Sequence, residues 1–318
     1  MVSAVKLGSG EFTYEVQVGW EKLPSGYTWR EAVAVAVDSR DRVYVFSRRD
    51  KPNVTVFDSD GAYLDSWGEG VFTGAHGLTI GPDDTIYCAD SVDHTVRKCT
   101  LDGKVLMTLG EPGKPAQAFG GDPFNRCTHV ALDPGTGDIY VADGYSNARV
   151  HKYSPDGKLL FSWGEPGTDP GEFNCVHNIA TDKDGYVYVC DRENSRVQVF
   201  DSKGKLEAVW NNIHRPCAIF ITNEQHVFIG ELGGGSAFNR PAPGIGPRLS
   251  VYNTSGERLA RIGESGFGWD VGQFAAPHGI ALDSKGDIYV AEVAWTNMSH
   301  YTTPTDGVRS LQKLVKAP

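Results

Sequence analysis

The chain has 318 residues and a formal net charge of −10 at pH 7, with 30 basic against 40 acidic side chains. This acidic balance argues against a protein that binds nucleic acid through its phosphates. No apolar stretch reaches the roughly 18 residues that a membrane-spanning helix needs, so we expect no membrane segment. The length fits one domain covering residues 1–318.

The first predicted element is an outer strand at residues 12–20, FTYEVQVGW, which precedes every inner strand. We expect it to lie beside residues 308–316 and to complete the last structural unit. Such a pairing would close a ring of units and leave no exposed strand edge there.

A short apolar strand core then recurs six times along the chain, each time after an apolar strand and a polar turn. Regular repetition of short strands, without helix-period runs, predicts an all-β fold, a six-bladed β-propeller. The six cores are Val43–Val45, Ile86–Cys88, Ile139–Val141, Val187–Val189, Val227–Ile229 and Ile288–Val290.

Aligning the units on these cores reveals a histidine pattern. His76, His177 and His278 each lie ten residues before the core of the second, fourth and sixth unit. The matching positions in the other units hold Val33, Thr128 and Cys217. Because equivalent positions in a ring are related by rotation about its axis, three histidines in alternate units converge on the centre. Three imidazoles with one open position are the ligand set of a catalytic zinc ion.

A single histidine near a strand start is more often structural than a metal ligand, but three matched and alternating histidines are hard to obtain by chance. The metal site is therefore the favoured interpretation, with zinc first and iron or manganese not distinguished by the sequence. His129 lies one residue past Thr128 and can also face the axis. The remaining histidines are assigned to surface or structural roles.

Three more polar side chains follow strand cores, at corners that lie near the predicted metal. Tyr145 is a candidate general base, and Arg48 and Arg192 are candidates to hold a carboxylate. Each one taken alone is more often a surface or packing residue, so the assignment depends on their clustering with the histidines.

The six cysteines show no C-x-x-C spacing, and several lie in predicted strands. We read them as mostly free thiols. The N-terminus shows no charged region followed by an apolar one, so no secretory signal is expected. Both observations predict a cytoplasmic protein.

The motifs AHGL (75–78), VHNIATDKDGYVYVCDRENSRVQVF (176–200) and APHGI (276–280) resemble NHL-repeat propellers, specifically peptidyl-α-hydroxyglycine α-amidating lyase. The resemblance runs from about residue 33 to 301 and is also dense at 128–165. It implies that His76, His177 and His278 bind zinc, that Tyr145 is catalytic, and that Arg48 and Arg192 are active-site arginines. The implied reaction is C–N cleavage of an α-hydroxyglycine hemiaminal to glyoxylate and an amide, without a redox cofactor.

The sequence departs from this family in several ways. At the positions of one of the family's cysteine pairs this chain has Asn125 and Ser146. At the positions of the other cysteines it has Tyr188 and Val199. The family's structural calcium is held partly by an Asp where this chain has Gly279, which argues against calcium here. No monooxygenase domain is seen, so the expected substrate is a small molecule rather than a peptide. The oligomeric state is not predicted.

Two other functions stay open at this point. A metal-dependent hydrolase acting on an ester, lactone or amide would use the same site. A non-catalytic NHL scaffold that binds protein or RNA is disfavoured, because a scaffold needs no axial histidines and the chain is acidic.

Overall fold

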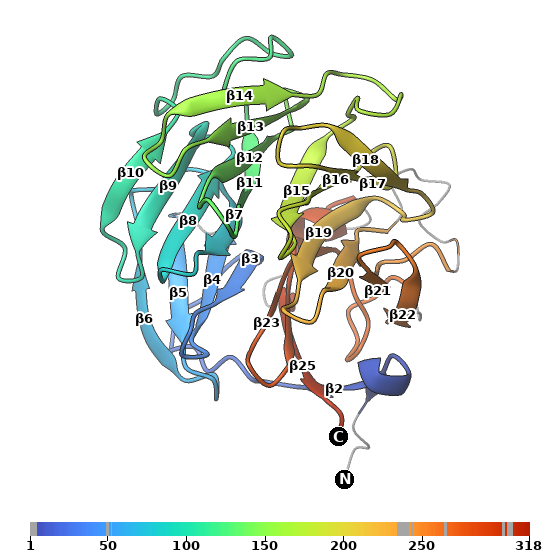
Figure 1. Cartoon of the computed structure of the whole chain (residues 1–318). Coiled ribbons are helices and arrows are strands. Elements are labelled where there is room, and N and C mark those ends of the chain that lie inside the picture. Colours follow the sequence, from blue (N-terminus) through green and yellow to red (C-terminus); the bar gives the residue numbers. More distant parts are fainter. Residues whose placement is uncertain are drawn as a thin grey trace.

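Six β-sheets are arranged around a common centre in the computed structural model of the chain (Figure 1). The structure describes residues 5–48, 51, 53–233, 242, 244–263, 266–300, 303 and 308–318. Five of the sheets have four strands and the sixth has five. The predicted six-bladed β-propeller is therefore confirmed.

In blades 1 to 5 the strands run in chain order from the centre outward, whereas the two outermost strands of blade 6 come from the N-terminus. Blade 1 comprises β3 (Glu31–Val37), β4 (Val43–Arg48), β5 (Asn53–Phe57) and β6 (Tyr63–Trp67). Blade 2 comprises β7 (Ala75–Ile80), β8 (Thr85–Asp90), β9 (Thr95–Thr100) and β10 (Val105–Leu109). Blade 3 comprises β11 (Cys127–Leu132), β12 (Ile139–Asp143), β13 (Arg149–Tyr153) and β14 (Leu159–Trp163).

Blade 4 comprises β15 (Val176–Thr181), β16 (Val187–Asp191), β17 (Arg196–Phe200) and β18 (Leu206–Trp210). Blade 5 comprises β19 (Pro216–Ile221), β20 (His226–Glu231), β21 (Arg248–Asn253) and β22 (Arg258–Ile262). Blade 6 comprises β23 (Pro277–Leu282), β24 (Ile288–Glu292), β25 (Leu311–Lys316), β2 (Tyr14–Gln17) and β1 (Lys6–Leu7). A 3₁₀ turn (Gly10–Phe12) and the short helix α1 (Ala294–Met298) are the helical elements of the described residues.

The two ends of the chain close the ring. Strand β2 pairs antiparallel with β25, with Tyr14 opposite Lys316 and Gln17 opposite Lys313. The expected completion of the last blade by the N-terminal strand is confirmed, and β1 adds one further strand outside it. Closure joins blade 6 to blade 1 as neighbours, which holds the central strands of all six blades in one ring.

Apolar side chains pack between neighbouring blades rather than within one blade. Tyr140 and Val150 of blade 3, for example, share a buried cluster with Ile179 and Phe200 of blade 4. The second strand of every blade is almost entirely buried on both faces, as expected for a layer between two others. This packing fixes the position of each inner strand relative to the axis.

A β-bulge interrupts the pairing of the first strand with the second at the same place in every blade. In blade 2, for example, Ala75 pairs with Asp90 and Gly77 with Ala89, so His76 is left out of register. A bulge of this kind redirects a side chain. The six bulged residues are Val33, His76, Thr128, His177, Cys217 and His278, the same six that the repeat alignment matched.

The six cysteines are free thiols, and five of them are buried. At the positions of the family's disulfides, the Ser146 amide donates to the Asn125 carbonyl and Tyr188 lies opposite Val199 on the neighbouring strand. Within the described part of the chain, no helix has the length and apolar character needed to cross a membrane.

Candidate metal centre

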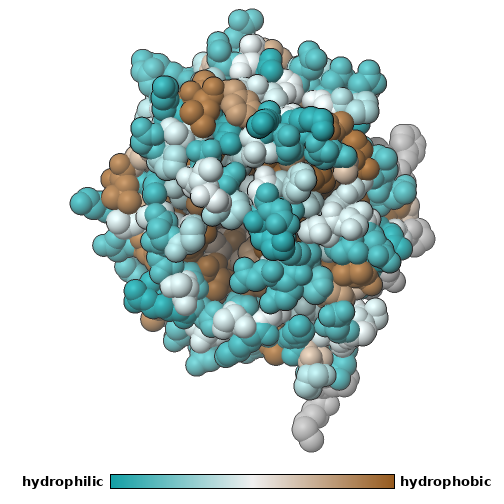
Figure 2. Space-filling view, viewed as in Figure 1, coloured by the Kyte–Doolittle hydropathy of each residue, from teal (hydrophilic) through white to brown (hydrophobic). Residues whose placement is uncertain are grey.

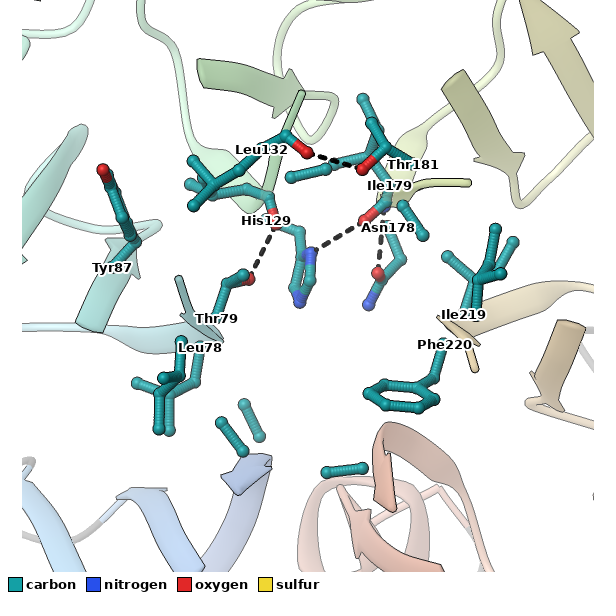
Figure 3. Close-up of a pocket in the computed structure, with 18 of the residues that line it drawn as sticks. Leu78, Thr79, Tyr87, His129, Leu132, Asn178, Ile179, Thr181, Ile219 and Phe220 are labelled. Carbon is teal, nitrogen blue, oxygen red and sulfur yellow. Dashed lines mark hydrogen bonds between the residues drawn. The ribbon is translucent and has the colours of Figure 1, made fainter. Parts of the chain in front are cut away.

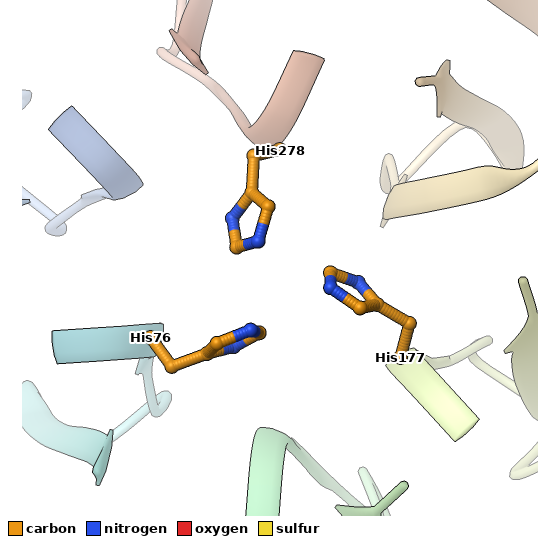
Figure 4. A group of neighbouring side chains, drawn as sticks. All are labelled: His76, His177 and His278. Carbon is orange, nitrogen blue, oxygen red and sulfur yellow. The ribbon is translucent and has the colours of Figure 1, made fainter. Parts of the chain in front are cut away.

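Three imidazoles meet on the propeller axis. His76, His177 and His278 are buried, and one ring nitrogen from each lies within 4.8 Å of those of the other two (Figure 4). The bulges of blades 2, 4 and 6 aim these side chains inward. The sequence prediction that alternate blades bring three histidines together is confirmed.

Each imidazole is held by a carbonyl of the next blade around the ring. The Nδ1 of His76 contacts the Thr128 carbonyl oxygen, that of His177 the Cys217 oxygen, and that of His278 the Val33 oxygen, each at 2.7 Å. Because a carbonyl only accepts, Nδ1 carries the proton and Nε2 keeps its lone pair. The bulged residues of the odd-numbered blades thus fix the tautomer of the histidines in the even-numbered blades, as metal-binding histidines require.

All three rings are neutral at physiological pH. Burial lowers the pKa of His278 to about 3, with the nearby Arg48 acting in the same direction. Burial also lowers the pKa of His76 and of His177 well below the ordinary value, helped by His278 beside His76 and by Arg192 beside His177. Three neutral imidazoles on one axis, with their lone pairs directed by Nδ1 hydrogen bonds, fit a divalent cation.

Tyr145 lies against two of these rings. Its hydroxyl oxygen is 2.9 Å from Nε2 of His76 and 3.0 Å from Nε2 of His177. The single hydroxyl hydrogen of Tyr145 can be donated to only one of these two Nε2 atoms. The lone pair of the other Nε2 therefore has no proton from Tyr145. Burial raises the pKa of Tyr145, and the cations Arg192 and Arg48 oppose that rise.

A glycine allows the tyrosine to reach this position. Gly144 lies so close to blade 4 that a Cβ there would be 1.9 Å from the Val176 carbonyl oxygen. Any side chain at residue 144 would push the corner of blade 3 away from blade 4. The close approach places Tyr145 over the histidines of its neighbours.

The two predicted arginines flank the tyrosine and the histidines. Arg192 has Nη1 at 3.4 Å from the Tyr145 hydroxyl, and its guanidinium lies 5.4 Å from the centre of the tyrosine ring. Arg48 lines the same cavity, where it donates from Nε to the Ala75 carbonyl and from Nη1 to a buried carboxylate. All six candidate residues predicted from the sequence therefore lie in one region.

Three charged residues of the site were not found from the sequence. Glu31 accepts from Arg48, while Glu193 accepts from Arg192 and forms a two-point pair with Arg215. These arginines lower the pKa of Glu193 to about 2 against the opposing effect of burial. Glu31 and Arg215 each lie two residues before a bulged residue, so moving the repeat alignment by two positions would have identified them.

A cavity of about 270 Å³ opens beside this cluster. Arg48, Arg192 and Arg215 contribute three positive charges to its wall, together with Tyr145 and His278. The lining also includes Val293, Thr296, Asn297 and His300, which come from α1 and the chain around it. The cavity suits a small anionic molecule that reaches the histidine cluster.

His129 belongs to a different part of the axis. Its Nδ1 contacts the Ile179 carbonyl at 3.2 Å, and it lines a second cavity rather than the histidine cluster. The expectation that it can face the axis is met, but it does not join the other three.

Comparison with known proteins shows similarity to NHL-repeat proteins and to peptide-amidating enzymes. Residues 173–200 match the family model for the NHL repeat. Human NHL repeat-containing protein 3 is 30% identical over 94% of this chain and 86% of its own length. The Drosophila melanogaster peptidyl-alpha-hydroxyglycine alpha-amidating lyase 1 is 34% identical over 71% of this chain and 44% of its own length. The Rattus norvegicus peptidylglycine alpha-amidating monooxygenase is 29% identical over 96% of this chain and 34% of its own length.

The resemblance to amidating lyases drawn from the sequence is thereby confirmed, although this chain spans less than half of either amidating protein. Among solved structures, a streptogramin B lyase superimposes with a TM-score of 0.61 at 14% identity, over 97% of both chains. A gluconolactonase from Xanthomonas campestris gives a TM-score of 0.61 at 11% identity, over 96% of this chain and 91% of its own. At such low identity these structures support the fold alone.

Proposed function

This chain belongs to the NHL-repeat protein family, and from that premise we propose that it is a metal-dependent lyase, with zinc as the ion. The proposed reaction cleaves the C–N bond of an α-hydroxyglycine-type hemiaminal and releases glyoxylate and an amide. The observation that carries the proposal is the axial cluster of three neutral imidazoles with a tyrosine hydroxyl 2.9–3.0 Å from two of them. Similarity to proteins named amidating lyases favours this reaction over hydrolysis.

The arginines explain how such a substrate is oriented. Arg192 and Arg48 line the cavity beside the histidines, and each is held by a carboxylate, Glu193 and Glu31. A guanidinium fork matches the two oxygens of a carboxylate, so the acid end of the substrate binds there. Binding at that end leaves the carbon with the hydroxyl group next to the histidines and Tyr145.

Tyr145 moves the proton in this proposal. Its oxygen takes the proton of the substrate hydroxyl, the C–O bond becomes the aldehyde of glyoxylate, and the C–N electron pair leaves on nitrogen. Tyr145 then returns the proton to that nitrogen, which completes the amide without consuming water. Burial raises the pKa of Tyr145, and the positive charges of Arg192 and Arg48 oppose that rise, which helps the phenol oxygen to accept the proton.

His76, His177 and His278 would hold the metal through Nε2, with Nδ1 fixed by the carbonyls of the next blades. A bound divalent cation supplies Lewis acidity for the substrate oxygens. The cavity volume of about 270 Å³ suits a small-molecule substrate, without a nucleic acid or membrane partner.

The test is an assay of the metal-loaded protein with N-acyl-α-hydroxyglycines, with glyoxylate and amide measured in ¹⁸O-labelled water. We expect both products in equal amounts, with no solvent-dependent excess of label in the amide. Incorporation of ¹⁸O into a carboxylic acid formed from the acyl part of the substrate would indicate a hydrolase instead, whereas label in the aldehyde oxygen of glyoxylate reflects exchange with water. Absence of turnover on this class, with no effect of His177→Ala on any measured property, would support a scaffold.

A further inference from the structure

A second and larger cavity lies on the axis, at the opposite end from the cavity with the arginines. It has a volume of about 530 Å³, and its walls come from the inner strands of all six blades. The blades follow one another in opposite rotational order in Figures 3 and 4, so the two views look along the axis from its two ends. Figure 2 shows a hollow near the centre of this face with apolar surface inside it.

The six residues that directly follow the bulges form one ring around the axis, and four of them line this cavity: Ala34, His129, Asn178 and Gly279. Of the six, four are alanine or glycine, and the two polar residues come from the neighbouring blades 3 and 4. In blade order the six are Ala34, Gly77, His129, Asn178, Ala218 and Gly279. A Cβ on Gly77 would be 2.3 Å from the Thr128 carbonyl and 2.8 Å from the His129 ring, so the glycine makes room for that imidazole.

One residue, Ile179, fixes both polar side chains through its backbone. Its carbonyl accepts from Nδ1 of His129 at 3.2 Å, and its amide donates to Oδ1 of Asn178 at 2.9 Å. Burial lowers the pKa of His129 to about 4, so the ring is neutral and Nε2 presents a lone pair. Asn178 is only 3% exposed, and its Nδ2 has no hydrogen-bond partner among the described residues.

The two side chains point into the cavity, with Nε2 of His129 and Nδ2 of Asn178 side by side (Figure 3). One nitrogen is a donor and the other an acceptor. Apolar side chains, among them Leu78, Ile219 and Phe220, form the wall around them. Lys98 is the only cation among the described residues of the wall, and it is paired with Asp83 at 3.2 Å.

We propose that this cavity binds a neutral primary amide or lactam that carries an apolar group. The ligand carbonyl accepts from Nδ2 of Asn178, the ligand N–H donates to Nε2 of His129, and the apolar group contacts Phe220 and Leu78. A carboxylate is excluded because it has no donor for the histidine lone pair and no free cation for its charge. The proposal does not depend on the lyase reaction, which uses the other end of the axis.

The test is a calorimetric titration of the wild-type protein with benzamide, and with benzoate as the anionic molecule of the same shape. We expect saturable binding of benzamide at one site per chain and at least tenfold weaker binding of benzoate. Equal affinity for the two, or no saturable benzamide binding, would overturn the proposal. Benzamide should bind equally well after metal removal with a chelator, which separates this site from the metal centre.

Two asparagine variants locate the site. Asn178→Ala gives blade 4 the residue that blades 1 and 5 already have at this position, so we expect a folded protein with at least tenfold weaker benzamide binding. Asn297→Ala makes the same chemical change in the wall of the arginine cavity and should leave benzamide affinity unchanged. Wild-type affinity in Asn178→Ala would contradict the proposal, and the wild-type comparison with benzoate remains decisive if that variant does not fold.

Discussion

The even-numbered and odd-numbered blades share one backbone and differ in one side chain. Each first strand carries the same bulge, but blades 2, 4 and 6 place a histidine on it, whereas blades 1, 3 and 5 place Val33, Thr128 and Cys217. The even blades supply imidazoles to the axis. The odd blades supply the carbonyl oxygens that orient those imidazoles.

The comparison separates the backbone geometry, which all six blades share, from the metal-binding side chains, which only three blades carry. The bulge and the inward direction of its residue belong to all six blades. The metal-binding chemistry requires only three substitutions, because the supporting hydrogen bonds come from backbone carbonyls that any residue would provide. The following predictions test this division, from the largest expected effect to the smallest.

The largest effect is expected from removing an even-blade ligand. We expect His177→Ala to lower metal affinity by ~100-fold or more and to abolish turnover, because two imidazoles do not complete the site. Cys217→Ala removes a thiol that lies 3.5 Å from Nδ1 of His177 but leaves the carbonyl that holds this nitrogen at 2.7 Å, so metal content should match the wild type. Metal analysis of both purified variants checks this, and full metal content in His177→Ala would remove that residue from the site.

Tyr145→Phe is expected to keep the metal and to lose turnover by roughly 10²–10⁴-fold, since the proton acceptor is removed while the histidines stay. Measuring kcat and metal content on the same sample separates the two roles. A variant as active as the wild type would disprove the proposed role of the tyrosine as the base.

Arg192→Gln should raise KM for carboxylate-bearing substrates by about 10–100-fold, because one cation facing the substrate acid is lost. Arg258→Gln removes an arginine from the exposed part of the outer strand β22 and serves as the control. Steady-state kinetics on both variants test the assignment. An unchanged KM in Arg192→Gln would place the carboxylate elsewhere.

The last prediction concerns the stability, rather than the function, of the metal-depleted protein at acid pH. Burial lowers the pKa of His129 to about 4 and that of His278 to about 3, so the unfolded chain takes up protons first as pH falls. Their contribution to stability is complete above about pH 6.5 and is lost progressively down to these values, at most about 1.4 kcal/mol per pH unit for each ring.

Urea unfolding between pH 7 and pH 4 measures this slope. His129→Asn removes an odd-blade imidazole and should reduce the slope without changing metal binding by the even blades. A free energy of unfolding that does not change over this range would contradict the neutral buried state of these rings.

The sequence by itself determined the propeller, the alternation of histidines and the six candidate residues of the metal end. It did so because repeats report rotational symmetry: residues at one repeat position must form one ring around the axis, whatever their side chains. The repeat alignment also identified Tyr145, Arg48 and Arg192, because each lies at the corner that follows an equivalent strand. The family resemblance supported this choice.

Only the tertiary structure decided which groups pair across blades. The pairing of Glu193 with Arg192 and Arg215 depends on side-chain directions at two different corners, which no repeat position specifies. The second cavity likewise appears only when the inner strands of all six blades surround the axis, and there the backbone of Ile179 joins Asn178 and His129. The repeat symmetry determines at which height along the propeller axis a residue lies. Hydrogen bonds between blades depend instead on interatomic distances that are set only when the blades pack against one another.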